Sequence, residues 1–129
     1  MVKLNEKNRT EYTRLVLESL EAGELDRFRT LLLDLHPTDQ VEIFTSLKEP
    51  LRRKVYQAIG PEELAILFQE LELESQMEFF KELEPDYAFT MLENMSADDL
   101  DDFLGHLPEK LVEDFSTFMG QHGHQGKRL

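Results

Sequence analysis

Residues 60–71 contain the pattern that organises this chain, and they read Gly-Pro-Glu-Glu-Leu-Ala-Ile-Leu-Phe-Gln-Glu-Leu. Four apolar residues in this stretch stand at positions i, i+3, i+4 and i+7, namely Leu64, Leu67, Phe68 and Leu71. This spacing is typical of one face of an α-helix. Gly60-Pro61 marks the end of one helix and the start of the next, because proline suits the first helical turn. The stretch therefore predicts a short helix and a tight turn.

The pattern recurs at every twelfth position along most of the chain. Three columns of residues share this spacing and are apolar at nearly every position. The first column is Leu35, Leu47, Ile59, Leu71, Leu83, Met95, Leu107 and Met119; the second is Ile43, Val55, Leu67, Phe79, Met91, Phe103 and Phe115; the third is Phe44, Tyr56, Phe68, Phe80, Leu92, Leu104 and Ser116. Because a unit of this length holds only a few helical turns, each unit predicts one short helix with its connection.

Helices this short are not stable alone, so neighbouring units must stack into a helical solenoid. Pro37, Pro61 and Pro85 recur at every second unit, which favours a pair of helices as the structural repeat. Before the repeats, residues 8–21 and 24–34 predict two further helices separated by Gly23. We therefore predict an all-α fold of about nine helices over residues 1–119. Residues 120–129 are rich in glycine and predict a flexible tail or linker.

Composition narrows the classes of function. The 129 residues include 27 acidic and 14 basic ones, for a formal net charge of −13, and no cysteine. An acidic chain is a poor ligand for nucleic acid or an anionic membrane surface. The absence of cysteine excludes disulfides and thiolate metal sites, and it fits the reducing interior of a cell. No apolar run approaches the ~20 residues that a transmembrane helix needs.

The negative charge is concentrated in the second half of the chain. Residues 1–61 carry ten acidic and ten basic residues and are neutral overall. Residues 62–114 carry 17 acidic residues against Lys81 and Lys110, a net charge of −15. The first half also contains a short basic run, Arg52-Arg53-Lys54. One half of the predicted solenoid is therefore strongly anionic.

The densest acidic cluster consists of Asp98, Asp99, Asp101 and Asp102. Ser96 and Asp99 form a sequence pattern typical of a helix start. On a helical wheel with Leu100 at the core, Asp98 and Asp102 fall about 160–200° away and one turn apart. Two outward carboxylates on adjacent turns suit Mg²⁺, which keeps several of its waters, but another surface would have to complete the site. The alternative is an acidic face that only keeps the protein soluble.

The remaining candidate residues point to no enzyme. His122 and His124 could bind a transition metal but more often have no such role in a tail, and His36 and His106 are predicted to be structural at helix ends. There is no nucleophile elbow and no glycine-rich phosphate loop. The phenylalanines at helical spacing are predicted to form the core. We find no catalytic constellation.

Two segments of the repeat carry a further signal. They are Leu35-His36-Pro37-Thr38-Asp39 followed by Val41-Glu42-Ile43-Phe44, and the run Leu92-Glu93-Asn94-Met95-Ser96-Ala97-Asp98-Asp99-Leu100-Asp101-Asp102-Phe103-Leu104 that ends at Leu107-Pro108. Both resemble the intracellular N-terminal domain of MgtE-type magnesium channels. The likeness spans about residues 24–119. It implies a right-handed superhelix that lies in the cytosol ahead of CBS domains and a membrane pore. It also implies that Mg²⁺ binds between this domain and the CBS domains, and that this binding shuts the pore.

The resemblance implies that Asp98 and Asp102 are Mg²⁺ ligands and that Asp99 and Asp101 strengthen the negative electrostatic field around them. It further implies a dimer formed through the parent protein. Residues 120–129 do not resemble the continuation of the family, so we expect either an excised domain or a free-standing relative. The leading hypothesis is a regulatory, Mg²⁺-sensing domain. The competing hypothesis is an acidic helical-repeat scaffold that binds a basic protein partner without metal.

Overall fold

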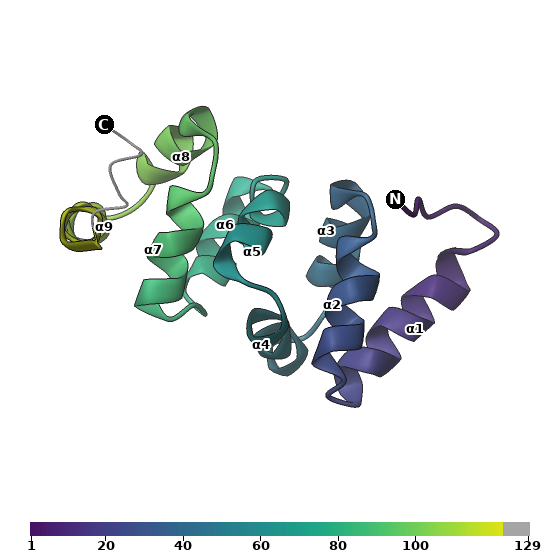
Figure 1. Cartoon of the computed structure of the whole chain (residues 1–129). Coiled ribbons are helices and arrows are strands. Elements are labelled where there is room, and N and C mark those ends of the chain that lie inside the picture. The colour runs from purple at the N-terminus through teal and green to yellow at the C-terminus, as the bar shows by residue number, and fades with distance from the viewer. Residues whose placement is uncertain (123–129) are drawn as a thin grey trace.

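The computed structural model describes residues 1–122 and contains nine helices in that range (Figure 1). Their bounds are α1 Arg9–Glu21, α2 Leu25–Leu33, α3 Pro37–Ser46, α4 Glu49–Ala58, α5 Pro61–Phe68, α6 Leu73–Phe80, α7 Pro85–Glu93, α8 Ala97–Leu104 and α9 Glu109–His122. Within the same residues there is no strand, and the only extended pairing is an isolated bridge between Val2 and Leu35. The prediction of an all-α fold is confirmed.

The sequence repeat determines where the helices begin. Helices α2 to α9 start at positions 25, 37, 49, 61, 73, 85, 97 and 109, so the starts are evenly spaced and follow the period of the apolar columns. Pro37, Pro61 and Pro85 are each the first residue of a helix, where the missing N–H costs no hydrogen bond. The repeat therefore begins one unit earlier than the sequence columns indicate, with α2. Helix α1 begins about one turn before the position that this spacing gives, but its buried Val16 and Leu20 keep the register of Phe28 and Leu32 in α2.

Three pairs of helices that are two apart in sequence pack closely against each other. The pairs α3 with α5, α5 with α7, and α2 with α4 are in contact, while α1 packs against α2 and α4. This supports a pair of helices as the structural repeat. Figure 1 shows the helices following one another along the molecule from α1 at one end to α9 at the other. The right-handed sense of the superhelix stays a prediction.

The apolar columns form the core. Every member of the second column is buried, from Ile43 in α3 to Phe115 in α9. Aromatic edge-to-face contacts join successive layers, and Phe103 of α8 lies 5.4 Å from Phe68 and 5.2 Å from Phe80 between ring centroids. The prediction that the phenylalanines are core residues is confirmed. These contacts also fix the orientation of α8.

A further column lies at the fourth residue of each helix and is not evident from the sequence. Gln40, Arg52 and Gln76 occupy it and are buried although they are polar. Each donates a hydrogen bond to a carbonyl just before its helix or near the end of an earlier one: Gln40 to Leu35 (2.9 Å), Arg52 to Leu47 (2.6 Å) and Gln76 to Phe68 (2.9 Å). These side chains satisfy backbone groups that the tight connections leave without helical partners.

Arg52 also holds α4 against the start of the α6–α7 connection. Its guanidinium donates to both carboxylate oxygens of Glu82, at 3.0 and 2.5 Å, and the Tyr56 hydroxyl donates to the same carboxylate at 2.7 Å. The guanidinium carbon lies 4.5 Å from the centroid of the Phe79 ring. Burial alone would raise the pKa of Glu82, but the hydrogen bonds from Arg52 and Tyr56 outweigh it and the pKa is lowered.

This lowered pKa predicts acid-dependent stability. Since the carboxyl of Glu82 binds its proton less readily in the folded state, its contribution is fully present above about pH 4.5 and is lost as the pH falls through the folded pKa. Urea denaturation of the wild type and of Glu82→Gln should show the wild type more stable at neutral pH, with the difference shrinking as the pH falls below 4.5. A difference that stays constant over that range would contradict the assignment.

The ends of the chain depart slightly from prediction. The φ of 78° at Gly23 ends α1 with a turn that glycine adopts without strain. Helix α9 continues to His122, beyond the Met119 boundary that the repeat indicates. The predicted tail from residue 123 onward lies outside the described residues, as does His124. None of the helices within residues 1–122 combines the length and hydrophobicity needed to span a bilayer.

Candidate functional site: the acidic surface of α8

Helix α8 is anchored at its first turn. The Ser96 hydroxyl accepts a hydrogen bond from the Asp99 amide at 3.4 Å and donates one to the Asp99 carboxylate at 2.8 Å. The Ser96 amide donates to the side chain of Gln69 at the end of α5. The predicted helix start at Ser96 is confirmed. Together with the buried Leu100 and Phe103, these contacts fix which face of α8 is turned outward.

All four aspartates of α8 are exposed. Asp98 and Asp102 stand one turn apart on the side away from the core, as the helical wheel predicts. Within residues 1–122, the Asp98, Asp101 and Asp102 carboxylates form no ion pair, whereas that of Asp99 is held by Ser96. In the same range no three His, Cys, Asp or Glu side chains come together as a metal-binding group. The surface therefore offers carboxylates without closing a metal site.

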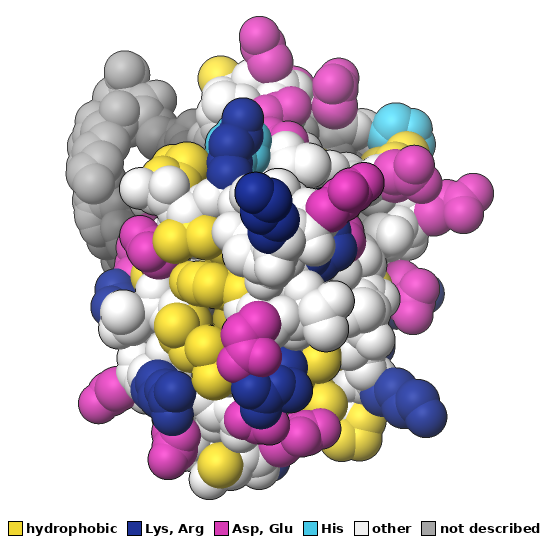
Figure 2. Space-filling model, turned by 90° about the vertical axis from the view of Figure 1, so that its right-hand side faces the viewer, with side chains coloured by type: hydrophobic (Ala, Val, Ile, Leu, Met, Phe, Trp, Pro, Cys, Tyr) yellow, Lys and Arg dark blue, Asp and Glu magenta, His cyan; other side chains and the backbone are white. Residues whose placement is uncertain are grey.

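The basic run Arg52-Arg53-Lys54 makes its contacts with residues outside α8. Arg52 is buried against Glu82, Arg53 pairs with Glu49 at 2.7 Å, and Lys54 lies 3.4 Å from the backbone carbonyl of Glu21. The basic run is thus engaged within the molecule. Figure 2 shows the α1 end of the molecule, where cationic and anionic side chains alternate. Glu63 and Glu82 of residues 62–114 pair with Arg29 and Arg52, whereas Asp98, Asp101 and Asp102 form no ion pair within residues 1–122.

The histidines that the structure describes at helix ends are structural. His36 precedes α3, and its Nδ1 accepts a hydrogen bond from the Thr38 amide at 3.1 Å. His106 follows α8, and its Nδ1 lies 2.9 Å from the Asp102 carbonyl oxygen. Both predictions of a structural role are confirmed. The side chain of His122 lies outside the described residues, so its metal role is untested.

The α8 surface fits a hydrated cation better than a dehydrated one. Exposed carboxylates on adjacent turns can bind Mg²⁺ through one or two oxygens while the ion keeps several waters. The helix N-terminus favours anions, which offsets part of the repulsion between the aspartates. A cation held in this way leaves coordination positions open towards a second surface. By themselves these carboxylates do not complete the coordination of a cation.

Fold and surface together define a helical-repeat domain with one strongly anionic flank. The family model of the MgtE intracellular N domain matches residues 35–125, so this chain belongs to that family. The magnesium transporter MgtE of Enterococcus faecalis (strain ATCC 700802 / V583) is 35% identical over 80 residues, which cover 60% of this chain and 18% of the transporter.

A solved structure shares the fold. The crystal structure of the soluble part of a magnesium transporter matches with a TM-score of 0.76 and 31% identity, over 82% of this chain and 42% of that chain. This chain therefore spans less than half of either relative. Both relatives are described as transporters or parts of them, and neither as an enzyme.

Proposed function

We propose that this domain is a cytosolic Mg²⁺-sensing regulatory domain of a magnesium transporter. In this proposal Asp98 and Asp102 bind Mg²⁺ together with a facing surface of the CBS domains, and Asp99 and Asp101 strengthen the local negative field. The observation that carries the proposal is that the Asp98 and Asp102 carboxylates are exposed, and form no ion pair within residues 1–122, on an otherwise well-anchored helix. In the same proposal the second anionic surface belongs to the CBS domains, and the domain regulates the pore of the transporter; membership of the MgtE N-domain family supports this.

The mechanism follows from charge neutralisation. Without Mg²⁺, the anionic flank of residues 62–114 repels a second anionic surface and the two stay apart. When Mg²⁺ binds between them, the repulsion is replaced by shared coordination and the closed assembly becomes the more stable state. Because α8 is fixed by Ser96, Leu100 and Phe103, the approach of its carboxylates moves the whole domain. The coupling to the pore is then a shift between two arrangements.

The first test is calorimetric titration of the isolated chain with Mg²⁺. Because half of each site is missing, we expect a Kd no tighter than about 1 mM. Removing carboxylates by Asp98→Asn with Asp102→Asn should weaken even this binding. The matched control is Glu74→Gln with Glu78→Gln, which removes the same charge at the same spacing on the exposed face of α6. Micromolar binding to the isolated chain would contradict a shared site.

A further inference from the structure

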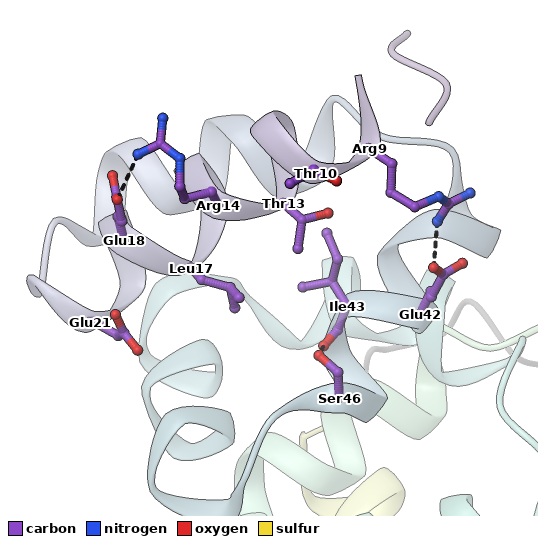
Figure 3. A pocket seen from close by; sticks show the side chains of 10 residues that line it. All are labelled: Arg9, Thr10, Thr13, Arg14, Leu17, Glu18, Glu21, Glu42, Ile43 and Ser46. Carbon is purple, nitrogen blue, oxygen red and sulfur yellow. Dashed lines mark hydrogen bonds and ion pairs between the residues drawn. The ribbon is translucent and has the colours of Figure 1, made fainter. Parts of the chain in front are cut away.

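A groove lies between α1 and α3 at the neutral end of the molecule (Figure 3). The cavity has a volume of about 610 Å³, and Leu17 and Ile43 supply its apolar surface. Thr10, Thr13 and Ser46 line it as well. Figure 3 shows the Arg9–Glu42 ion pair bridging the two helices at one end and Glu21 at the other. The groove is open along its length between these charges.

The groove lies where α1 and α3 are not packed closely against each other. Helices α3 and α5, like α5 and α7, pack as second neighbours. Helix α1 instead packs against α2 and α4, although its buried Val16 and Leu20 keep the register of the buried Phe28 and Leu32 of α2. One flank of α3 is therefore left with space beside it.

The exposed face of α1 carries a basic, an apolar and an acidic side chain in that order along the helix. Arg14, Leu17 and Glu21 all line the groove and stand at positions i, i+3 and i+7 of one helical stripe. The cation precedes the leucine by one turn and the acid follows it by one turn. Arg14 pairs on its own helix with Glu11 and Glu18, in exposed contacts that are easily exchanged. The Glu21 carboxylate forms no ion pair within residues 1–122.

We propose that this groove binds helix α1 of a second copy of the same chain. The two α1 helices would run antiparallel about a two-fold axis, each lying beside α3 of the other copy. Reversing the stripe brings Leu17 of each copy together and sets Arg14 of each beside Glu21 of the other. A contact that complements itself in this way closes as a dimer and leaves no open end.

The distribution of charge favours this end of the molecule for self-association. Residues 1–61 are neutral, whereas residues 62–114 carry a net charge of −15. Two copies therefore repel each other through their anionic halves and not through the α1 end. Figure 2 shows apolar side chains gathered in a band on this end, with charges of both signs around it. Because this end is neutral overall, it does not attract a strongly basic or strongly acidic partner electrostatically.

Sedimentation equilibrium of the purified chain in EDTA, from about 10 to about 500 µM, tests the proposal. We expect a reversible monomer–dimer equilibrium, and Leu17→Asp should leave only monomer. The control is Ile66→Asp, because Ile66 is 51% exposed on α5 and lies outside the groove. Circular dichroism checks that each variant remains helical. A wild type that stays monomeric, or association that requires Mg²⁺, would overturn the proposal.

The charge pairs allow a sharper comparison. Arg14→Glu and Glu21→Arg should each weaken the dimer about tenfold, because each places like charges side by side. The double variant restores both pairs with reversed sign and should return to nearly wild-type association. A double variant that associates no better than either single one would contradict the antiparallel arrangement. These results do not depend on Mg²⁺ binding, so they are separable from the test of the α8 site.

Discussion

Arg52→Ala is expected to lower the free energy of unfolding by about 3–5 kcal/mol. The change removes the guanidinium that binds Glu82 through two hydrogen bonds and the Leu47 carbonyl through a third. Both side chains of the ion pair are only 10% exposed, so the carboxylate would be left buried without its counter-ion. Since small domains have a total stability of about 5–15 kcal/mol, this is a large fraction of it. Urea denaturation followed by circular dichroism measures the loss.

The neighbouring residue provides the control. Arg53 forms its ion pair with Glu49 on the surface, with both side chains 54% exposed, so Arg53→Ala should cost less than about 1 kcal/mol. Arg52→Met combined with Glu82→Leu should recover much of the stability, because a buried pair can be replaced by apolar side chains more cheaply than it can be broken. If Arg52→Ala cost no more than Arg53→Ala, the Arg52–Glu82 contact would not hold the repeat together.

The second large effect is functional and concerns Asp98→Asn with Asp102→Asn in a complete transporter that carries this domain. Removing two negative charges weakens the repulsion that keeps the facing surfaces apart, so the closed state should gain about 1–2 kcal/mol in the absence of Mg²⁺. This corresponds to roughly a tenfold change in the ratio of closed to open states. The loss of ligands should also flatten the dependence on Mg²⁺. Ion flux measured across a series of Mg²⁺ concentrations reports both changes.

The Glu74→Gln, Glu78→Gln pair again provides a control with the same change of net charge. It should shift the flux curve less, because the charges removed lie on α6 and not on α8. The stability of the isolated domain should change by only a few tenths of a kcal/mol in either double variant, since like charges at i, i+4 repel weakly on an exposed face. An unchanged Mg²⁺ dependence in the Asp98, Asp102 variant would remove these residues from the proposed mechanism.

The sequence predicts the repeat well because one physical requirement acts on every unit. Each short helix must bury the same face, so the second column is apolar throughout and the helix starts keep an even spacing. The first unit is hard to recognise because Gly23 occupies the position of the first column, although Leu31 and Leu32 continue the other two. The outward direction of Asp98 and Asp102 is predictable from the same helical geometry.

Two features could not be predicted because they depend on distant partners. Gln40, Arg52 and Gln76 look like surface residues in sequence, and only the packing of neighbouring units buries them. The partner of Arg52 lies 30 residues further along the chain, at a spacing that no local pattern marks. The groove between α1 and α3 likewise has no local signal. The proposed metal site is not fully predictable from this chain either, because the proposal places its other ligands on another surface.

In the proposed mechanism, α8 presents half of a Mg²⁺ site that a second surface completes. Hydrogen exchange of the amides of residues 97–104, with and without Mg²⁺, tests it most directly in two samples, the isolated chain and a complete transporter that carries it. We predict that Mg²⁺ well below about 1 mM slows exchange in α8 of the complete protein and leaves the isolated chain, which binds Mg²⁺ only at about 1 mM or above, unchanged. Equal protection in both samples, or none in the complete protein, would contradict the claim.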